Sequence, residues 1–69
     1  MNLTAARAKA ASKARETGEA HVVATIDHEE GRRVCVYPLE YAETAPEFEA
    51  FEGKILAIVE PDGAVFECA

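Results

Sequence analysis

The chain has 69 residues, of which 49% are apolar and 29% are charged, and its net charge is −6. This length limits it to one domain, residues 1–69, and the composition is that of a globular protein, which excludes a disordered chain. Its longest apolar run, Ile55–Val59, is far shorter than the roughly 18 residues of a transmembrane helix, and its N-terminal segment lacks the apolar region of a secretory signal. We therefore expect a cytoplasmic protein.

Charge is distributed unevenly along the chain. Residues 1–15 carry four basic residues and no acid, whereas residues 16–69 carry all 13 acids and three basic residues, so the two parts have charges of +4 and −10. An acidic body of this kind repels nucleic acids and anionic membranes and attracts basic protein surfaces. We expect no direct nucleic-acid binding, no membrane association and a protein partner with a basic surface.

Residues 3–17, LTAARAKAASKARET, predict an N-terminal helix because they are mostly good helix formers. Asn2 or Thr4 is a suitable N-cap, and Gly18 is a suitable left-handed stop. The apolar positions form one stripe consisting mainly of methyl groups: Leu3, Ala6, Ala10 and Ala14. Since a buried methyl group contributes only about 0.8 kcal/mol, we expect this helix to dock weakly.

Two pairs of segments rich in β-branched residues predict two hairpins. The first pair is residues 20–27 and 32–38, joined by the turn HEEG, and the second is residues 54–60 and 64–68, joined by PDG. Between the hairpins, residues 46–51 predict a short helix.

In this short helix, Pro46 suits the first turn and Gly53 the end, while Phe48 and Phe51 share one face. The predicted fold is therefore α+β: an N-terminal helix followed by a small antiparallel sheet of two hairpins, in the order α-β-β-α-β-β. We expect helices on one face of the sheet and a partly open second face. Phe48, Phe51 and Tyr41 should cover one edge. The main core candidates are Val22, Ala24, Ile26, Val34, Val36, Leu56, Ile58 and Phe66.

The sequence contains no pattern typical of catalysis. Ser12 is the only serine, and there is no phosphate-binding glycine loop and no HExxH motif. His21 and Cys35 could meet across the first hairpin, but a catalytic Cys–His pair also needs an orienting group and a pocket. Cys35, Cys68, His21 and His28 lack the spacing of a zinc site. We expect a non-enzyme without cofactor or metal, with two reduced thiols, and leave a disulfide between them open.

Residues 40–53, EYAETAPEFEAFEG, contain no Lys or Arg. Their five glutamates are Glu40, Glu43, Glu47, Glu49 and Glu52. At a helical rise these carboxylates span roughly 18 Å, about one charge per 4 Å, close to the roughly 3.4 Å between phosphates of one DNA strand.

Further acids stand in the two predicted turns: Asp27, Glu29, Glu30, Glu60 and Asp62. Together with Tyr41, an aromatic candidate for an interface anchor, all ten acids are our predicted partner-binding residues. The alternative is a solvated acidic face that keeps the protein soluble.

In its size, its charge and its lack of catalytic motifs, with EYAETAPEFEAFEG as its acidic stretch, the chain resembles the anti-CRISPR proteins of bacteriophages and mobile elements. Within that group it is most similar to inhibitors of type I complexes, with type I-C as the narrower expectation. The resemblance implies a non-enzymatic inhibitor in the host bacterial cytoplasm. Such a protein would bind a Cascade-type complex and block its DNA-binding surface by mimicking the charge of DNA. The basic segment, residues 1–15, departs from a purely DNA-like surface.

A second hypothesis is a small interaction module, such as an antitoxin or a mobile-element accessory protein. It would bind through its aromatic face or by strand addition at a sheet edge. We expect a monomer, and the exposed sheet edge leaves a dimer open. A Cys/His redox or metal protein is the third hypothesis.

Overall fold

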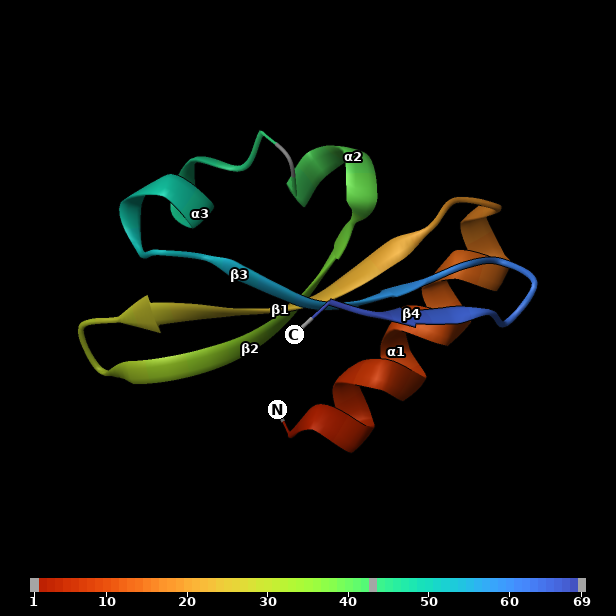
Figure 1. Ribbon diagram of the computed structural model, residues 1–69, viewed down its shortest axis with the longest axis horizontal. Helices are drawn as coiled ribbons and strands as arrows, with labels where there is room; N and C mark the ends of the chain where they lie inside the picture. The colour runs from red at the N-terminus through yellow and green to blue at the C-terminus, as the bar shows by residue number, and fades with distance from the viewer. Residues whose placement is uncertain (1, 43, 69) are drawn as a thin grey trace.

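The computed structural model describes residues 2–42 and 44–68. Its elements in chain order are α1 (Leu3–Thr17), β1 (His21–His28), β2 (Gly31–Pro38), α2 (Leu39–Ala42), α3 (Pro46–Ala50), β3 (Lys54–Val59) and β4 (Val65–Glu67). The strands form one antiparallel sheet in the order β2-β1-β3-β4 (Figure 1). The predicted α+β fold, with an N-terminal helix and two hairpins, is confirmed, and α2 is a further short helix that we did not predict.

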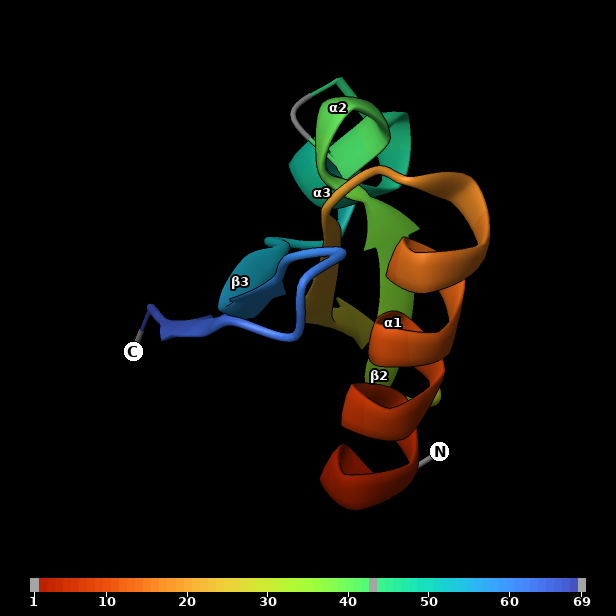
Figure 2. The same ribbon diagram turned by 90° about the vertical axis from the view of Figure 1, so that its right-hand side faces the viewer.

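β1 is buried on both of its faces. Val22 and Ala24 pack with Ala42 of α2, whereas Val23 packs with Ala6 and Ala10 of α1. Successive side chains of a strand point to opposite faces, so α1 and the α2–α3 segment cover opposite faces of the sheet. Figure 2 shows them separated in this way. The expectation of helices on one face only is therefore wrong, because the chain after β2 folds back over the other face. That second face is only partly covered, since Tyr37, Ile55 and Ile58 remain half-buried there.

The end residues of α1 are those that the sequence indicates. The Asn2 side chain accepts a hydrogen bond from the Ala5 N–H at 2.7 Å, and Gly18, with φ of 75°, donates its N–H to the Ala14 carbonyl at 2.8 Å. Three alanines of the predicted stripe are fully buried against the sheet: Ala6, Ala10 and Ala14. Leu3, the one large side chain expected on this stripe, is instead 47% exposed. The contact of α1 with the sheet is thus made by methyl groups, which allow a close approach.

An irregularity in the pairing of β1 with β3 changes which residues of β3 share a face. Leu56 is the residue left without a register partner in β1. Ala57 and Val59 pack on the α1 side, whereas Ile55 and Ile58 pack on the other side. Simple alternation would group Leu56 with Ile58, but Leu56 lines a cavity on the α1 side. The bulge explains this, because it inserts one residue into the alternation.

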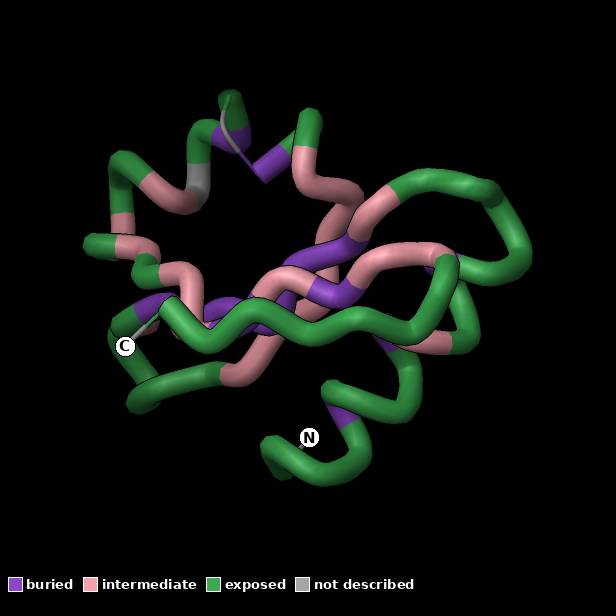
Figure 3. The backbone as a smooth tube through the Cα atoms, turned by 45° about the vertical axis from the view of Figure 1, so that its right-hand side comes forward, coloured by how far each residue is buried: buried purple, intermediate pink, exposed green. Residues whose placement is uncertain are grey.

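β4 is the exposed edge of the sheet. All three of its residues are exposed, and Phe66, which we predicted to lie in the core, is 55% exposed. Figure 3 shows the chain near the C-terminus as a continuous exposed segment, and the strand order places β3 between it and the buried β1. Phe66 pairs with Ile58 in register, but β4 has only three residues and has a neighbouring strand on one side only, so Phe66 stays exposed. The core prediction for Phe66 is therefore wrong.

We expect Ala10→Leu to destabilise the protein by about 1–3 kcal/mol, because the larger side chain pushes α1 away from the sheet. The melting temperature should fall by roughly 4–8 °C for each kcal/mol in a domain of this size. Ala8→Leu is the matched control, since Ala8 is an exposed residue of the same helix. Equal melting temperatures for the two variants would show that α1 does not need a close contact with the sheet.

Candidate interaction surfaces

The acidic segment, residues 39–52, is anchored to the sheet by small and aromatic side chains. Ala42 and Ala45 are buried, and Phe48 packs on the cluster around β1. The Tyr37 ring of β2 lies 5.6 Å from the Phe48 ring in an edge-to-face contact and 5.3 Å from the Tyr41 ring. Tyr41 is nevertheless 45% exposed. It therefore keeps the exposed aromatic surface that we predicted for an interface anchor.

The far end of this segment is fixed to the tip of the first hairpin. Phe51 contacts the His28 ring at a centroid distance of 5.0 Å, and its carbonyl accepts a hydrogen bond from the Asp27 N–H at 2.8 Å. Phe48 and Phe51 were expected to hold α3 against the core together. Only Phe48 belongs to the core cluster, whereas Phe51 binds α3 to the end of β1.

The chain leaves α3 through a tight turn at Glu52 and Gly53. Glu52 takes the left-handed conformation with φ of 52°, and Gly53 donates its N–H to the Phe48 carbonyl at 2.7 Å. This is the hydrogen bond of a Schellman-type helix end. Gly53 is needed for another reason, because a Cβ there would lie 2.5 Å from Cγ of Phe48. Gly53 is therefore required because its backbone lies close to the Phe48 ring. The residue in the left-handed conformation that ends the helix is Glu52.

Unpaired carboxylates are concentrated on this segment. Glu40, Glu49 and Glu52 are exposed, and none of the three forms an ion pair with another described residue. Glu43 lies outside the described residues, and so does the side chain of Glu47. The segment consists of two short helices, so the even spacing expected along one helical rise does not describe it. The three carboxylates instead lie on the outer surface of a segment that covers one face of the sheet.

The acids of the first hairpin turn are mostly neutralised. Asp27 accepts a hydrogen bond from Arg32 at 3.1 Å, and Glu30 is bound by Arg33 at 2.9 Å. Glu29 is exposed and has no ion pair within the described part of the chain. Of the three acids predicted here to meet a partner, two are therefore already occupied by arginines.

Glu60 and Asp62 lie at the other end of the sheet, in the β3–β4 turn. The Asp62 carboxylate accepts a hydrogen bond from the Ala64 N–H at 2.9 Å, so it shapes the turn. The antiparallel register places Val59 beside His21, which is the end of β1 opposite to the Asp27–Glu30 turn. The structure therefore does not bring the two groups of turn acids together on one face.

Arg7 of α1 binds Glu67 of β4 through two hydrogen bonds of 2.5 and 2.8 Å. These bonds and the attraction between the charges raise the pKa of Arg7 and, led by the hydrogen bond, lower the pKa of Glu67. A carboxyl whose pKa is lowered by folding stabilises the fold above its unfolded pKa, and this contribution is lost as the pH falls through the folded pKa. Because both side chains are exposed to solvent, the contribution is small. The pair mainly orients β4 and cancels its charge.

The outer edge of β4 is an apolar candidate surface. Val65 is 47% exposed, and Phe66 is 55% exposed. The Glu60 N–H donates to the Ala64 carbonyl, and the Cys68 N–H donates to the Leu56 carbonyl. In an antiparallel pair, alternate residues bond to the neighbouring strand. The backbone N–H and C=O groups of Val65 and Glu67 therefore point away from β3. Sequence reasoning did not identify this edge, because alternation predicts faces and does not predict the order of strands.

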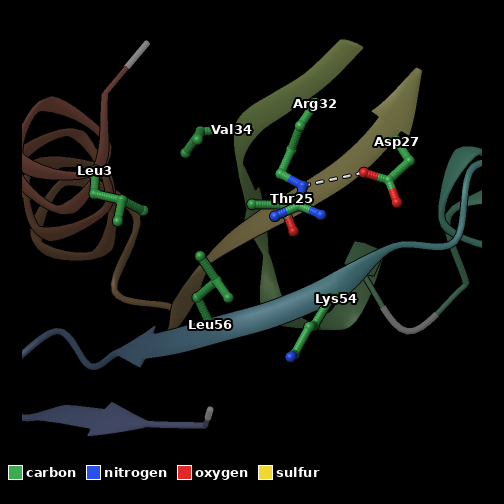
Figure 4. A pocket seen from close by; sticks show the side chains of 7 residues that line it. All are labelled: Leu3, Thr25, Asp27, Arg32, Val34, Lys54 and Leu56. Carbon is green, nitrogen blue, oxygen red and sulfur yellow. Dashed lines mark hydrogen bonds and ion pairs between the residues drawn. The ribbon is translucent and has the colours of Figure 1, made fainter. Parts of the chain in front are cut away.

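A cavity of about 320 Å³ lies between the N-terminal end of α1 and the sheet (Figure 4). Its polar groups are already largely occupied, since the Arg32 guanidinium is bound to Asp27. Lys54 is its one cation without an ion pair among the described residues. The lining residues are Leu3, Thr25, Asp27, Arg32, Val34, Lys54 and Leu56.

The contact considered between His21 and Cys35 does not form. In the hairpin register His21 pairs with Pro38 and Cys35 with Ala24, so the two side chains lie three positions apart on opposite faces. Cys35 and Cys68 are free thiols.

Within residues 2–42 and 44–68, no group of three or more His, Cys, Asp and Glu side chains is placed to hold a metal ion. No helix in this part of the chain has the length and apolar character needed to cross a membrane.

No protein-family model matches the chain, and no curated protein or solved structure that was compared with it matches either. Function must therefore be inferred from the surfaces of the chain itself. The acidic segment and the edge of β4 are two candidate interaction surfaces.

We expect Gly53→Ala to destabilise the protein by about 1–3 kcal/mol, because its Cβ would overlap the Phe48 ring. Thermal melting of Gly53→Ala, Phe48→Leu and the double variant tests this. The double variant should be more stable than the sum of the single effects predicts, since leucine removes ring atoms from the contact. Additive effects would contradict the packing of Gly53 against Phe48.

Proposed function

We propose that this protein is a non-enzymatic inhibitor whose acidic segment occupies the basic, nucleic-acid-binding surface of a partner protein complex. The observation that supports this proposal is the set of exposed, unpaired carboxylates of Glu40, Glu49 and Glu52 on a segment fixed to the sheet at both ends. In contrast, the acids nearest to arginines, Asp27 and Glu30, are neutralised within the protein.

The arrangement of charge across the sheet also supports the proposal. The basic helix α1 packs on one face, and the acidic segment covers the other. A basic partner surface is therefore attracted by one side of the molecule and not by the other. Complementary potentials of this kind accelerate association and select orientation, and they are weakened by salt.

The partner class follows from the chemistry of the surface. Lysines and arginines that bind DNA phosphates would meet carboxylates held on a folded scaffold, and the bound inhibitor would exclude DNA from that site. By its resemblance to anti-CRISPR proteins, we propose a Cascade-type complex, with type I-C as the narrower candidate, as this partner. The protein would then act as a monomer in the cytoplasm of the host bacterium.

A pull-down of the tagged protein from a lysate that contains a type I complex tests the proposal. We expect a nucleic-acid-binding complex to be captured and to be released by duplex DNA and by moderate salt. Capture that resists both eluents would contradict the proposal, because the acidic segment would then not occupy the DNA site.

In the same assay, we expect Glu40→Lys/Glu49→Lys to weaken capture about tenfold or more, since each attraction becomes a repulsion. Glu16→Lys/Glu19→Lys is the matched control, because both residues are exposed, the change in net charge is equal, and the acidic segment stays intact. Circular dichroism should show that both variants keep the fold. Equal loss in the two variants would mean that net charge alone, and not this segment, determines binding.

A second candidate function is binding by strand addition at β4, as in an antitoxin or a mobile-element accessory protein. The observation that favours it is the exposed apolar pair of Val65 and Phe66 on an edge strand whose outer backbone groups face solvent. An edge of this kind can pair with an extended segment of another chain.

If the edge of β4 is the binding surface, Phe66→Ala should abolish capture, and capture by the wild type should survive high salt. Leu3→Ala is the matched control, because Leu3 is also a large exposed apolar residue and lies on α1. Full capture by Phe66→Ala would exclude the edge as the binding surface.

A further inference from the structure

A second groove lies between α1 and β2, on the face of the sheet opposite to the acidic segment. Its volume is about 360 Å³, at the small end of the range for small-molecule sites. Three residues of α1, spaced four apart, form one of its walls, and each follows a buried alanine by three positions. The lining residues are Lys9, Lys13, Thr17, His21, Val36 and Pro38.

His21 places a fixed nitrogen in this groove. Its side chain is only 4% exposed, and Nδ1 lies 2.9 Å from the Glu19 carbonyl oxygen. A carbonyl oxygen only accepts hydrogen bonds, so Nδ1 carries a proton and donates it, which leaves Nε2 of the neutral ring as an acceptor.

No other described residue bonds to this ring. The described part of the chain also has no fully buried side-chain nitrogen or oxygen without a partner, so Nε2 must keep access to solvent. His21 is a lining residue of this groove. An acceptor is therefore held at its base.

The groove is also positively charged. Lys9 and Lys13 are exposed and form no ion pair with any described residue, whereas the neighbouring cation Arg7 is bound to Glu67. The Thr17 hydroxyl donates to the Lys13 carbonyl at 2.9 Å, so its proton is already in use. The groove is thus lined by two lysines and one imidazole together with the apolar side chains of Val36 and Pro38.

From this juxtaposition we propose that the groove between α1 and β2 binds the phosphate monoester of a small organic molecule. Phosphate oxygens accept charge-assisted hydrogen bonds from Lys9 and Lys13. The second ionisation of a phosphate monoester lies near pH 6, so one proton is readily shared between a phosphate oxygen and Nε2 of His21. The organic group lies on Val36 and Pro38. A nucleic acid or an anionic membrane is disfavoured as the ligand by the net charge of −6.

Titration of the full chain with phenyl phosphate, inorganic phosphate and sulfate, followed by NMR, tests this site. We expect saturable shifts at His21, Lys9 and Lys13, with phenyl phosphate binding more tightly than inorganic phosphate because of the apolar side chains in the groove. At pH 6, where about half of the phosphate monoester carries a proton, sulfate should bind more weakly, since it carries no proton to share with Nε2. Absence of saturable shifts with either phosphate, or equal affinity for sulfate, would overturn the proposal.

Variants separate this site from general attraction to a basic helix. Lys9→Gln and Lys13→Gln should each weaken phenyl phosphate binding about tenfold or more, because each removes a charge-assisted hydrogen bond. Arg15→Gln is the matched control, since Arg15 is an exposed α1 cation that does not line the groove. All three positions are exposed, so the variants should keep the fold. An equal loss in Arg15→Gln would overturn the proposal by showing that the charge of α1 alone attracts the ligand.

Discussion

The burial of β1 on both faces is the constraint on which the rest of this structure depends. A strand at the centre of a small sheet needs a covering layer on each face, and a chain of 69 residues has few residues left outside the sheet to form these layers. On one face the layer is α1, and its alanines allow the helix backbone to approach Val23 closely. On the other face the layer is the acidic segment, held by Ala42 and Phe48. Because both layers lie over the middle of the sheet, β4 remains uncovered at the edge.

Local features of the fold could be predicted from the sequence, whereas the assignment of faces could not. The cap at Asn2, the stop at Gly18 and the two hairpins depend on residues close in sequence, and all of them are found. The pairing of β1 with β3 joins residues that are 29 to 38 positions apart in the sequence, and strand alternation carries no information about which strands pair. The bulge at Leu56 then shifts the alternation, and Phe66 pairs with a half-buried strand without being covered itself.

In the predicted acidic site, too, the contacts between residues close in sequence could be predicted, whereas those between distant residues could not. The two-residue turn of the first hairpin places Asp27 opposite Arg32, so this neutralisation could have been derived from the predicted hairpin itself. The bond from Arg7 to Glu67 joins residues 60 positions apart and depends on how β4 lies beside α1. The groove residue His21 carried no motif, since its role depends on one backbone carbonyl two residues away. Charge counts from sequence therefore overestimate the free acids and do not show where the free cations gather.

The separation of charge between the two covering layers has a physical consequence for recognition. Lys9, Lys13 and Arg15 stand on the layer opposite to the unpaired carboxylates of Glu40 and Glu49. A basic partner that meets the α1 layer is repelled, and the same partner that meets the acidic segment is attracted, so encounters are sorted by orientation before any close contact forms. An anionic ligand would instead be attracted to the α1 layer and repelled by the acidic segment. The sheet between the layers thus keeps two oppositely charged surfaces apart in a chain too small to have separate domains.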